Sequence, residues 1–500
     1  MRQSSPSPKF RTTRTNMVSP VSKQQRKGII VALVCVLLFV VANTLLLADE
    51  NYLLGLLPLG IALIWLFFKY PEAGLLLTAL ATPFSIDVVL LGETELSLPT
   101  EPMLILLSLV FLFRVLLMRN YDLRLLRHPV SLLVLAMLGW MFITSCTSEM
   151  PLVSFKYTVA RAWFVVPCYF AATTMLRTPQ ATRRFVWAYG LGLAVVVAIT
   201  TYKTLFNFSD LQTMHRVMKP FYNDHTAYGC IIALFLPAAI GLAADRGERL
   251  WLRICAVVLA ALLATGLVLS YCRAAWLSVA GALVVYLLIH YRVKLKWMLA
   301  MLALVAGLFF AFQGDLLYNM GKNKQDSSYE LADQLKSISN ISTDASNLER
   351  INRWASALRM WGERPVQGFG PGTYQFIYGR YQMDYQMTVI STNSGDLGNA
   401  HSEYIGPLSE QGVVGAGIVI ALFLTVFATG IRVYRTAKDQ SVRRMAVALC
   451  LCLFTYYVHG TLNNFLDTDK LSVPFWGMTA AIVALDVFSE KVPAARPRQE

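Results

Sequence analysis

Residues 252–271 of this chain read LRICAVVLAALLATGLVLSY, twenty residues with one charged side chain near the start. A helix of about 20 mainly apolar residues is long enough to cross the hydrocarbon core of a bilayer. Similar stretches recur along the 500 residues, 56% of which are hydrophobic and 15% charged. Lipid admits only helices and closed β-barrels, and a barrel sequence shows short alternating strands instead. The sequence therefore predicts an all-α polytopic membrane protein.

Fourteen segments have the composition of membrane spans, which predicts about 12–14 transmembrane helices. They cover residues 28–48, 52–68, 73–91, 101–118, 129–146, 155–176, 183–203, 226–243, 252–271, 275–290, 297–313, 404–430, 445–460 and 473–488. The segment 73–91 is the weakest, because Pro83, Ser85 and Asp87 interrupt it. A re-entrant or interfacial segment is the alternative there.

The basic residues predict the orientation of the spans. Short cytoplasmic loops of membrane proteins are rich in Lys and Arg. Basic residues fall in alternate loops here, whereas loops 92–100 and 461–472 carry almost none. With a cytoplasmic N-terminus, we expect a disordered basic cytoplasmic tail at 1–27, followed by about eleven spans in 28–313. A periplasmic loop with amphipathic helices should then cover 314–402, before three spans in 403–488 and a cytoplasmic tail at 489–500.

The net charge of +14 follows from this arrangement. Nucleic-acid binding is not expected, because the basic residues are spread over several loops and do not form one soluble basic surface. The eight cysteines lie in or at the ends of apolar spans without metal-ligand or disulfide spacing. No nucleotide-binding or zinc-protease motif occurs in the sequence. We therefore expect no metal and no cofactor.

The polar segment 314–402 has an internal order. Residues 346–349 have capping-box spacing, and Ile351, Trp354, Leu358 and Trp361 then repeat as one apolar helical face. We expect an amphipathic helix resting on the membrane domain. The glycine-rich stretch 363–372 that follows predicts a tight turn, either to bring backbone close to a ligand or simply to reverse the chain. Within the polar segment, residues 349–380 contain five arginines and only two glutamates, which suits an anionic ligand.

Cations also occur on the outer side of the spans. Arg216 and Lys219 lie in the loop before the span 226–243, and Arg273 begins another span. A guanidinium at headgroup depth can bind a pyrophosphate, although snorkelling towards ordinary lipid is the commoner role. His401 lies at the end of the polar segment, where an imidazole can act as a general base or as a structural hydrogen-bonding group.

Taken in order, these residues resemble the O-antigen ligase and O-antigen polymerase superfamily, and the ligase family most closely. The resemblance covers roughly 205–430, and it rests on Arg216, the sequence Arg273-Ala274-Ala275-Trp276, a large outer loop with residues 365–372, His401 and the stretch 410–415. It implies an inner-membrane, inverting and metal-independent glycosyltransferase of GT-C architecture. Many members carry an Asn-Pro-Asn-like segment after the first arginine, where this chain has Asn223-Asp224-His225-Thr226.

The resemblance also implies a reaction and roles for residues. A glycan would pass from undecaprenyl pyrophosphate to an acceptor hydroxyl at the periplasmic face. Arg216 and Arg273 would bind the donor pyrophosphate, and His401 would orient or deprotonate the acceptor. Further candidates for substrate contact are Arg350, Arg353, Lys219 and His225, the last of which is expected at the rim of the site.

The sequence leaves several acceptors for the glycan as alternatives. Lipid A core is favoured, because the basic half of the loop near His401 suits a phosphorylated acceptor. Polymerisation of O-antigen or exopolysaccharide and transfer to a protein hydroxyl would use the same donor. A transporter of lipid-linked glycans is the rival from another class, and it would show charges near the bilayer midplane and paired broken helices.

Overall fold

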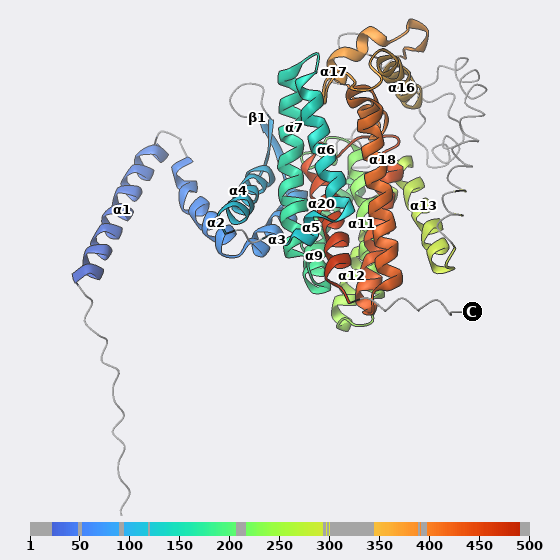
Figure 1. Cartoon of the computed structure of the whole chain (residues 1–500). Coiled ribbons are helices and arrows are strands. Elements are labelled where there is room, and N and C mark those ends of the chain that lie inside the picture. Colours follow the sequence, from blue (N-terminus) through green and yellow to red (C-terminus); the bar gives the residue numbers. More distant parts are fainter. Residues whose placement is uncertain are drawn as a thin grey trace, which may run out of the picture. The chain divides into compact units, whose positions relative to one another are not determined.

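The computed structural model describes residues 23–48, 53–89, 95–118, 121–206, 217–293, 297, 300, 345–388, 391 and 398–490, and helices dominate them (Figure 1). Nine helices in these ranges are long and apolar enough to cross a membrane. They are α4 Thr100–Met118, α6 Pro129–Cys146, α9 Pro179–Phe206, α11 His225–Ala244, α12 Leu250–Leu269, α13 Arg273–His290, α18 Ile405–Thr436, α19 Gln440–His459 and α20 Asp469–Phe488. The all-α polytopic class is thus confirmed, while the predicted span 297–313 lies outside the fully described ranges.

The chain divides into two compact units, of which the first ends at Trp65. Its described part contains α1 Lys23–Ala48, which covers the predicted span 28–48, and the short helix η1 Leu53–Leu56. The side chains described in α1 are mainly exposed and apolar, as expected of a helix whose surroundings are lipid. The helix α2, Leu57–Lys69, begins in this unit and ends in the second one.

The predicted span 73–91 is not one helix. α3 Pro71–Ala81 has 11 residues, or about 16 Å of helix, which is too short to cross a bilayer. It leads through η2 Thr82–Phe84 into an antiparallel hairpin of β1 Ile86–Val89 and β2 Glu95–Leu98, in which Ile86 pairs with Leu98. The prediction of one continuous span at 73–91 is therefore wrong, because the helix ends at Ala81, before Pro83 and the other interrupting residues.

The predicted span 155–176 is helical throughout but changes its winding. It consists of α7 Pro151–Val165, a π-helical turn η3 Val166–Ala171 and α8 Ala172–Met175. Pro167 lies in the π turn, where its missing N–H disturbs the regular hydrogen-bond ladder. α5 Leu123–Leu126 is a single turn between α4 and α6.

The core of the second unit surrounds α20, which is buried from Asp469 to Asp486. η3, α8, α18 and α19 pack against this helix. Trp476 meets Tyr169 edge-on with a ring-centroid separation of 6.2 Å, and Phe475 meets Tyr456 at 5.4 Å. An all-round buried helix at the centre explains why α20 shows no single apolar face in sequence.

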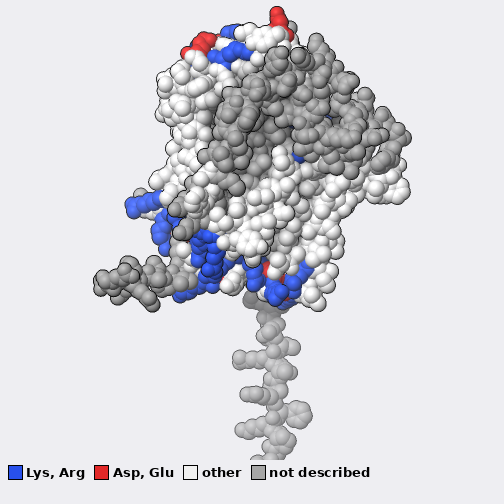
Figure 2. Space-filling model, turned by 90° about the vertical axis from the view of Figure 1, so that its right-hand side faces the viewer, with Lys and Arg blue, Asp and Glu red and all other residues white. Residues whose placement is uncertain are grey.

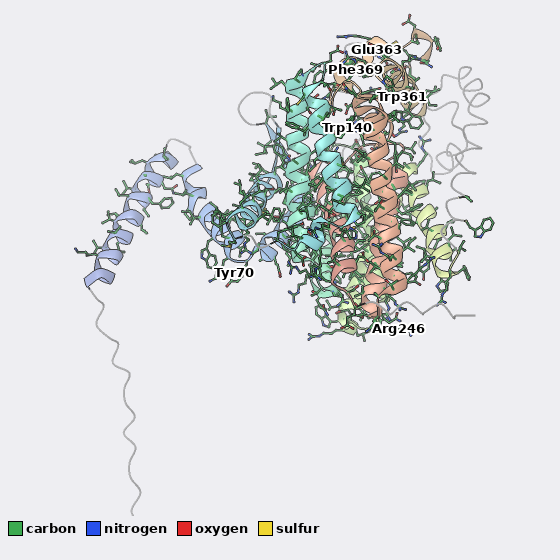
Figure 3. The ribbon with its side chains drawn as sticks, viewed as in Figure 1. Tyr70, Trp140, Arg246, Trp361, Glu363 and Phe369 are labelled. Carbon is green, nitrogen blue, oxygen red and sulfur yellow. The ribbon has the colours of Figure 1, made fainter. Side chains whose placement is uncertain are left out.

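The basic loops meet at one end of the bundle. Asp245, between α11 and α12, accepts hydrogen bonds from Arg183 at 2.7 Å and from Arg444 at 2.6 Å. Asp486 at the end of α20 likewise binds Arg432 at 2.7 Å. Lys and Arg gather there on the described surface (Figure 2), and Arg246 lies at the end opposite to Trp361 and Glu363 (Figure 3). The predicted grouping of the basic loops is confirmed.

One long helix and three short ones cap the other end of the bundle (Figure 1). They are α16 Ala345–Glu363, α17 Tyr374–Ile377, η4 Tyr378–Tyr381 and η5 Asp384–Gln386. The apolar face of α16 that was predicted to rest on the membrane domain is not the buried face of the helix. Leu358 is 46% exposed, and Ile351, Trp354 and Trp361 are only partly buried. The inward residues are Glu349, Asn352, Arg353, Ser356, Ala357 and Met360. Hydrogen bonds among and from these polar residues allow a largely polar face to be buried.

Candidate active site

The helix α18 breaks at Gly412, whose φ of +68° and ψ of −169° are not helical. A break leaves main-chain carbonyls without their helical partners. The glycine-rich turn supplies new ones, since Phe369 N donates to Ser409 O at 3.1 Å and Gly370 N donates to Glu410 O at 2.7 Å. The indole of Trp140 on α6 donates to Gln411 O at 2.9 Å (Figure 3). The turn therefore packs against the backbone of α18.

Two glycines permit this close approach. A Cβ at Gly412 would lie 2.1 Å from Val366 O, and one at Gly368 would lie 2.3 Å from Glu410 C. Both residues also have positive φ, which glycine adopts without strain. The glycine-rich stretch was predicted either to bring backbone close to a ligand or to reverse the chain. The structure shows that it reverses the chain and that its backbone closely approaches the backbone of α18.

His401 lies on the segment that joins this cap to α18. Its φ is +48°, and its main-chain N donates to Asn399 Oδ1 at 3.0 Å. The next residues are fixed as well, because Glu403 N donates to Gly460 O at 2.8 Å beyond the end of α19. A left-handed conformation at a residue other than glycine is uncommon, and it is often found at functional sites.

The surroundings of His401 keep its imidazole neutral. Burial and, to a smaller extent, the positive charges of Arg350 and Arg353 lower the pKa of His401 to about 3, while Asp224 opposes them. An imidazole with this pKa carries no charge near neutral pH, so one ring nitrogen has a lone pair available. Such a group can accept a hydrogen bond or a proton from a hydroxyl.

Arg350 connects His401 to the start of α13. Its Nε donates to Leu462 O at 3.2 Å, in the loop after α19. Burial raises the pKa of the Cys272 thiol to about 11, and both Arg350 and Asp224 lie close enough to influence it. Cys272 precedes Arg273, a partly buried residue that begins α13. The structure thus brings His401, Arg350 and the first turn of α13 to one place.

Arg353 is engaged by the protein itself. It is 7% exposed, and its Nε donates to Glu349 Oε1 at 2.7 Å. Its Nη1 donates to Asn399 O at 3.2 Å, and its guanidinium lies 5.0 Å from the ring centroid of Tyr378. These contacts hold the segment before His401 in place, so the geometry favours a positioning role over direct contact with substrate.

The loop before α11 is only partly described, and its described part lies near His401. Arg216, a predicted pyrophosphate ligand, lies outside the described residues. Lys219 is exposed in the turn 217–220, and His225 is the first residue of α11. Asp224 caps that helix by accepting from Thr226 N at 2.7 Å, and it acts on the pKa of His401. The loop therefore lies beside the cluster, with Asp224 placed by its capping bonds.

His459 is a residue that the sequence did not single out. It ends α19 and is 1% exposed, with Nε2 at 3.2 Å from Asn463 Nδ2. Its Nδ1 has no hydrogen-bond partner among the described residues, although Arg350 and the backbone of Ala274 lie nearby. Its position at the outer end of a predicted span, in a chain with six histidines, was the one available signal.

Within the described ranges, no group of three or more His, Cys, Asp or Glu side chains could hold a metal ion. The fold and the cluster define a polytopic helical membrane protein with a histidine and arginine site at the end opposite its basic loops. Residues 256–420 match the family model described as O-antigen ligase. This third of the chain is thus similar to the O-antigen ligase family, a family of membrane glycosyltransferases that includes ligases and polymerases, in agreement with the resemblance seen in the sequence. A search of curated proteins finds no match.

The matched region includes Arg273, Arg350, Arg353 and His401. It leaves out the loop with Arg216, Lys219 and His225, and it leaves out His459. The residues that the structure clusters thus come both from the family domain and from flanking helices. The roles expected of them are taken up as proposals.

Proposed function

We propose that this protein transfers a glycan from undecaprenyl pyrophosphate to an acceptor hydroxyl, at the periplasmic face of a bacterial inner membrane. The observation that carries the proposal is the neutral His401 beside Arg350, next to the first turn of α13 with Arg273. Glycan transfer from a pyrophosphate carrier needs a neutral base, which orients the nucleophile. It also needs fixed cations, which stabilise the departing pyrophosphate anion.

The proposed step forms one bond and breaks one bond. The acceptor oxygen attacks the anomeric carbon on the face opposite to the pyrophosphate, and the carbon–oxygen bond to the pyrophosphate breaks with its electron pair on the leaving oxygen. The configuration inverts. His401 accepts the acceptor proton, while Arg273, Arg350 and Arg216 bind the anion. In the free protein Arg350 lowers the pKa of His401, so a bound pyrophosphate that offsets this charge makes His401 a stronger base.

The function is proposed to be metal-independent, with arginine charges in the place that Mg²⁺ takes in other pyrophosphate-binding sites. Ligation to lipid A core is the acceptor reaction that we favour. The cap around His401 supports this, because Arg359, Arg364 and Arg380 on it could meet acceptor phosphates outside the site. Polymerisation of repeat units and transfer to protein remain outcomes of the assay.

The test uses the purified full chain in nanodiscs with an undecaprenyl pyrophosphate glycan and EDTA. Lipid A core, a shorter glycan on the same carrier and an acceptor peptide are supplied in parallel. Product on lipid A core supports ligation, and longer carrier-linked chains support polymerisation. Loss of transfer in EDTA would contradict the arginine mechanism, and transport without any transfer would favour the transporter.

Variants then test the site. We expect His401→Ala to lower kcat by about 10²–10⁴-fold, the usual contribution of a general base. Arg350→Gln should lower it by about 100-fold, by analogy with the loss of one oxyanion donor. The matched controls are His290→Ala at the opposite end of α13 and Arg124→Gln in α5, whose side chain is 67% exposed. Full activity in His401→Ala would refute the catalytic role.

A further inference from the structure

The loop 460–468, between α19 and α20, supports two groups of the candidate site. The carbonyl of its first residue accepts from Glu403 N at 2.8 Å, two residues after His401. Its Leu462 O accepts from Arg350 Nε at 3.2 Å. The general base and one cation of the proposed mechanism are therefore attached to one short loop, although they belong to different segments of the chain.

The carboxylate of Glu403 holds the far part of the same loop. Its Oε1 accepts from Leu466 N at 3.0 Å and from Tyr456 Oη at 2.5 Å. The hydroxyl of Tyr456 in turn accepts from Phe465 N at 3.1 Å. Glu403 is 7% exposed and Tyr456 is fully buried, and hydrogen bonds to a carboxylate are stronger than those between neutral groups. One residue therefore fixes the loop near both of its ends.

Arg161 on α7 fixes the loop a second time. Its Nη1 donates to Leu466 O at 2.9 Å, and its Nη2 lies 2.5 Å from Asp467 Oδ1. Leu466 is thus bonded to Glu403 through its N–H and to Arg161 through its carbonyl. The loop therefore has a fixed place beside α7, and Glu403 connects it to the segment of His401.

The side chain of Glu403 does not face the reacting groups. Together with Arg161 and Asp467 it lines a cavity of about 190 Å³, and the lining of this cavity includes neither His401 nor Arg350. The carboxylate therefore faces a different space from the base and the cation. It can act on them through the loop and through its own main chain, without touching a substrate that they hold.

We propose that Glu403 is a positioning residue, which sets the distance between His401 and Arg350 through the loop 460–468. The inference rests on the proposed function for its effect on transfer, whereas the coupling of Glu403 to the loop does not. The distance matters because the charge of Arg350 acts on His401, and Coulomb energy falls as the separation grows. A misplacement of about 1 Å at an active site can lower a rate by about 100-fold.

Three variants change the hydrogen bonds of Glu403 to different extents. Glu403→Leu removes both acceptor oxygens, whereas Glu403→Gln keeps one oxygen for Leu466 N and Tyr456 Oη. Tyr456→Phe removes a single hydroxyl, so it remains decisive if Glu403→Leu does not fold. The matched control is Tyr457→Phe in the same helix, because the hydroxyl of Tyr457 is buried and has no hydrogen-bond partner among the described residues.

Transfer kinetics with the full chain in nanodiscs give the first readout. We expect Glu403→Leu to lower kcat by about 100-fold and Tyr456→Phe by about tenfold, with donor and acceptor KM unchanged. Glu403→Gln should restore kcat to within about threefold of the wild type, and Tyr457→Phe should match it. A raised acceptor KM with unchanged kcat would overturn the proposal, because Glu403 would then contact the substrate itself.

A double-variant cycle separates positioning from general stabilisation. If Glu403 acts by placing Arg350 against His401, Tyr456→Phe should lower kcat by less than about twofold in an Arg350→Gln background, where the guanidinium is already absent. Independent effects would multiply instead. The same loss from Tyr456→Phe in both backgrounds would therefore overturn the proposal.

Hydrogen exchange gives a readout that does not need activity. Measured by mass spectrometry on the full chain without substrate, the amides of 460–468 and 399–404 should exchange faster in Tyr456→Phe than in the wild type, and Tyr457→Phe should not differ from it. Unchanged exchange in both segments would overturn the proposal. A wild type that shows the expected exchange but transfers glycan to no acceptor would refute the proposed function and leave the coupling of Glu403 to the loop standing.

Discussion

Replacement of Arg353 by methionine should destabilise the protein strongly. Arg353 and Glu349 are 7% and 4% exposed, and their atoms lie 2.7 Å apart. Removing one partner of a buried ion pair leaves an uncompensated charge, which costs about 3–5 kcal/mol. The lost cation–π contact with Tyr378 at 5.0 Å adds about 0.5–2 kcal/mol, although the two losses need not be additive. We expect a free-energy loss of about 4 kcal/mol.

The control is the ion pair between Arg380, in the cap, and Glu149, in the loop between α6 and α7, whose charged atoms lie 3.1 Å apart. Its arginine is 71% exposed, and surface pairs of this kind contribute only about 0–1 kcal/mol. Arg353→Met should therefore lower the melting temperature of the purified full chain by several degrees, and Arg380→Met should leave it nearly unchanged. Intrinsic fluorescence during thermal unfolding measures both. The double variant Glu349→Gln/Arg353→Met should recover part of the loss, because no buried charge remains unpaired.

The same variants distinguish a positioning role from substrate binding. If Arg353 positions the segment before His401, Arg353→Met lowers kcat together with stability, and the double variant restores some of each. A melting temperature equal to that of the wild type, combined with a raised donor KM, would refute this reasoning. It would instead support Arg353 as a ligand of the donor.

Two further predictions concern pH and the break in α18. His401, with a pKa near 3, stays neutral as pH falls through 6.5, so kcat/KM should show no loss from protonation of His401 above about pH 5. In Arg350→Gln the acid-side fall of kcat/KM should move to higher pH, because a positive charge near His401 is removed. A fall of wild-type kcat/KM near pH 6.5 would contradict this. Because the unfolded chain protonates this histidine first, its contribution to stability is present above pH 6.5 and is lost as pH falls towards 3. Gly412→Ala forces a Cβ to within 2.1 Å of Val366 O at positive φ, and should cost more than the 1–2 kcal/mol or so of left-handed strain alone. Gly417→Ala is the control. Equal melting temperatures for the two variants would show that the turn 364–372 moves away from Gly412 without loss of stability.

Much of the fold could be predicted from local properties of the sequence. The spans follow from runs of apolar residues, because only a helix satisfies its own backbone in lipid. The grouping of the basic loops follows from charge alone. The capping-box spacing at 346–349 lies in the first described turn of α16, so the helix was expected in the right place, and Pro83 with Ser85 marked the segment where a span fails.

The candidate site was only partly visible in the sequence. His401, Arg350 and Arg273 were singled out by residue type and by resemblance, and the structure brings His401 and Arg350 to the start of α13. His459 was missed because nothing in its neighbourhood distinguishes it from a histidine that merely ends a span. The cavity was not visible at all, since its lining comes from five regions of the chain that are far apart in sequence.

Composition and charge by themselves determined that this chain is a helical membrane protein, with its basic loops at one end and a polar cap at the other. Only the tertiary structure decided which face of α16 is buried, how the turn 364–372 satisfies the broken α18, and which helix ends meet around His401. The physical reason is the range of the forces. Partition into lipid acts on each segment separately, whereas hydrogen bonds and ion pairs between helix ends depend on packing that no single segment encodes.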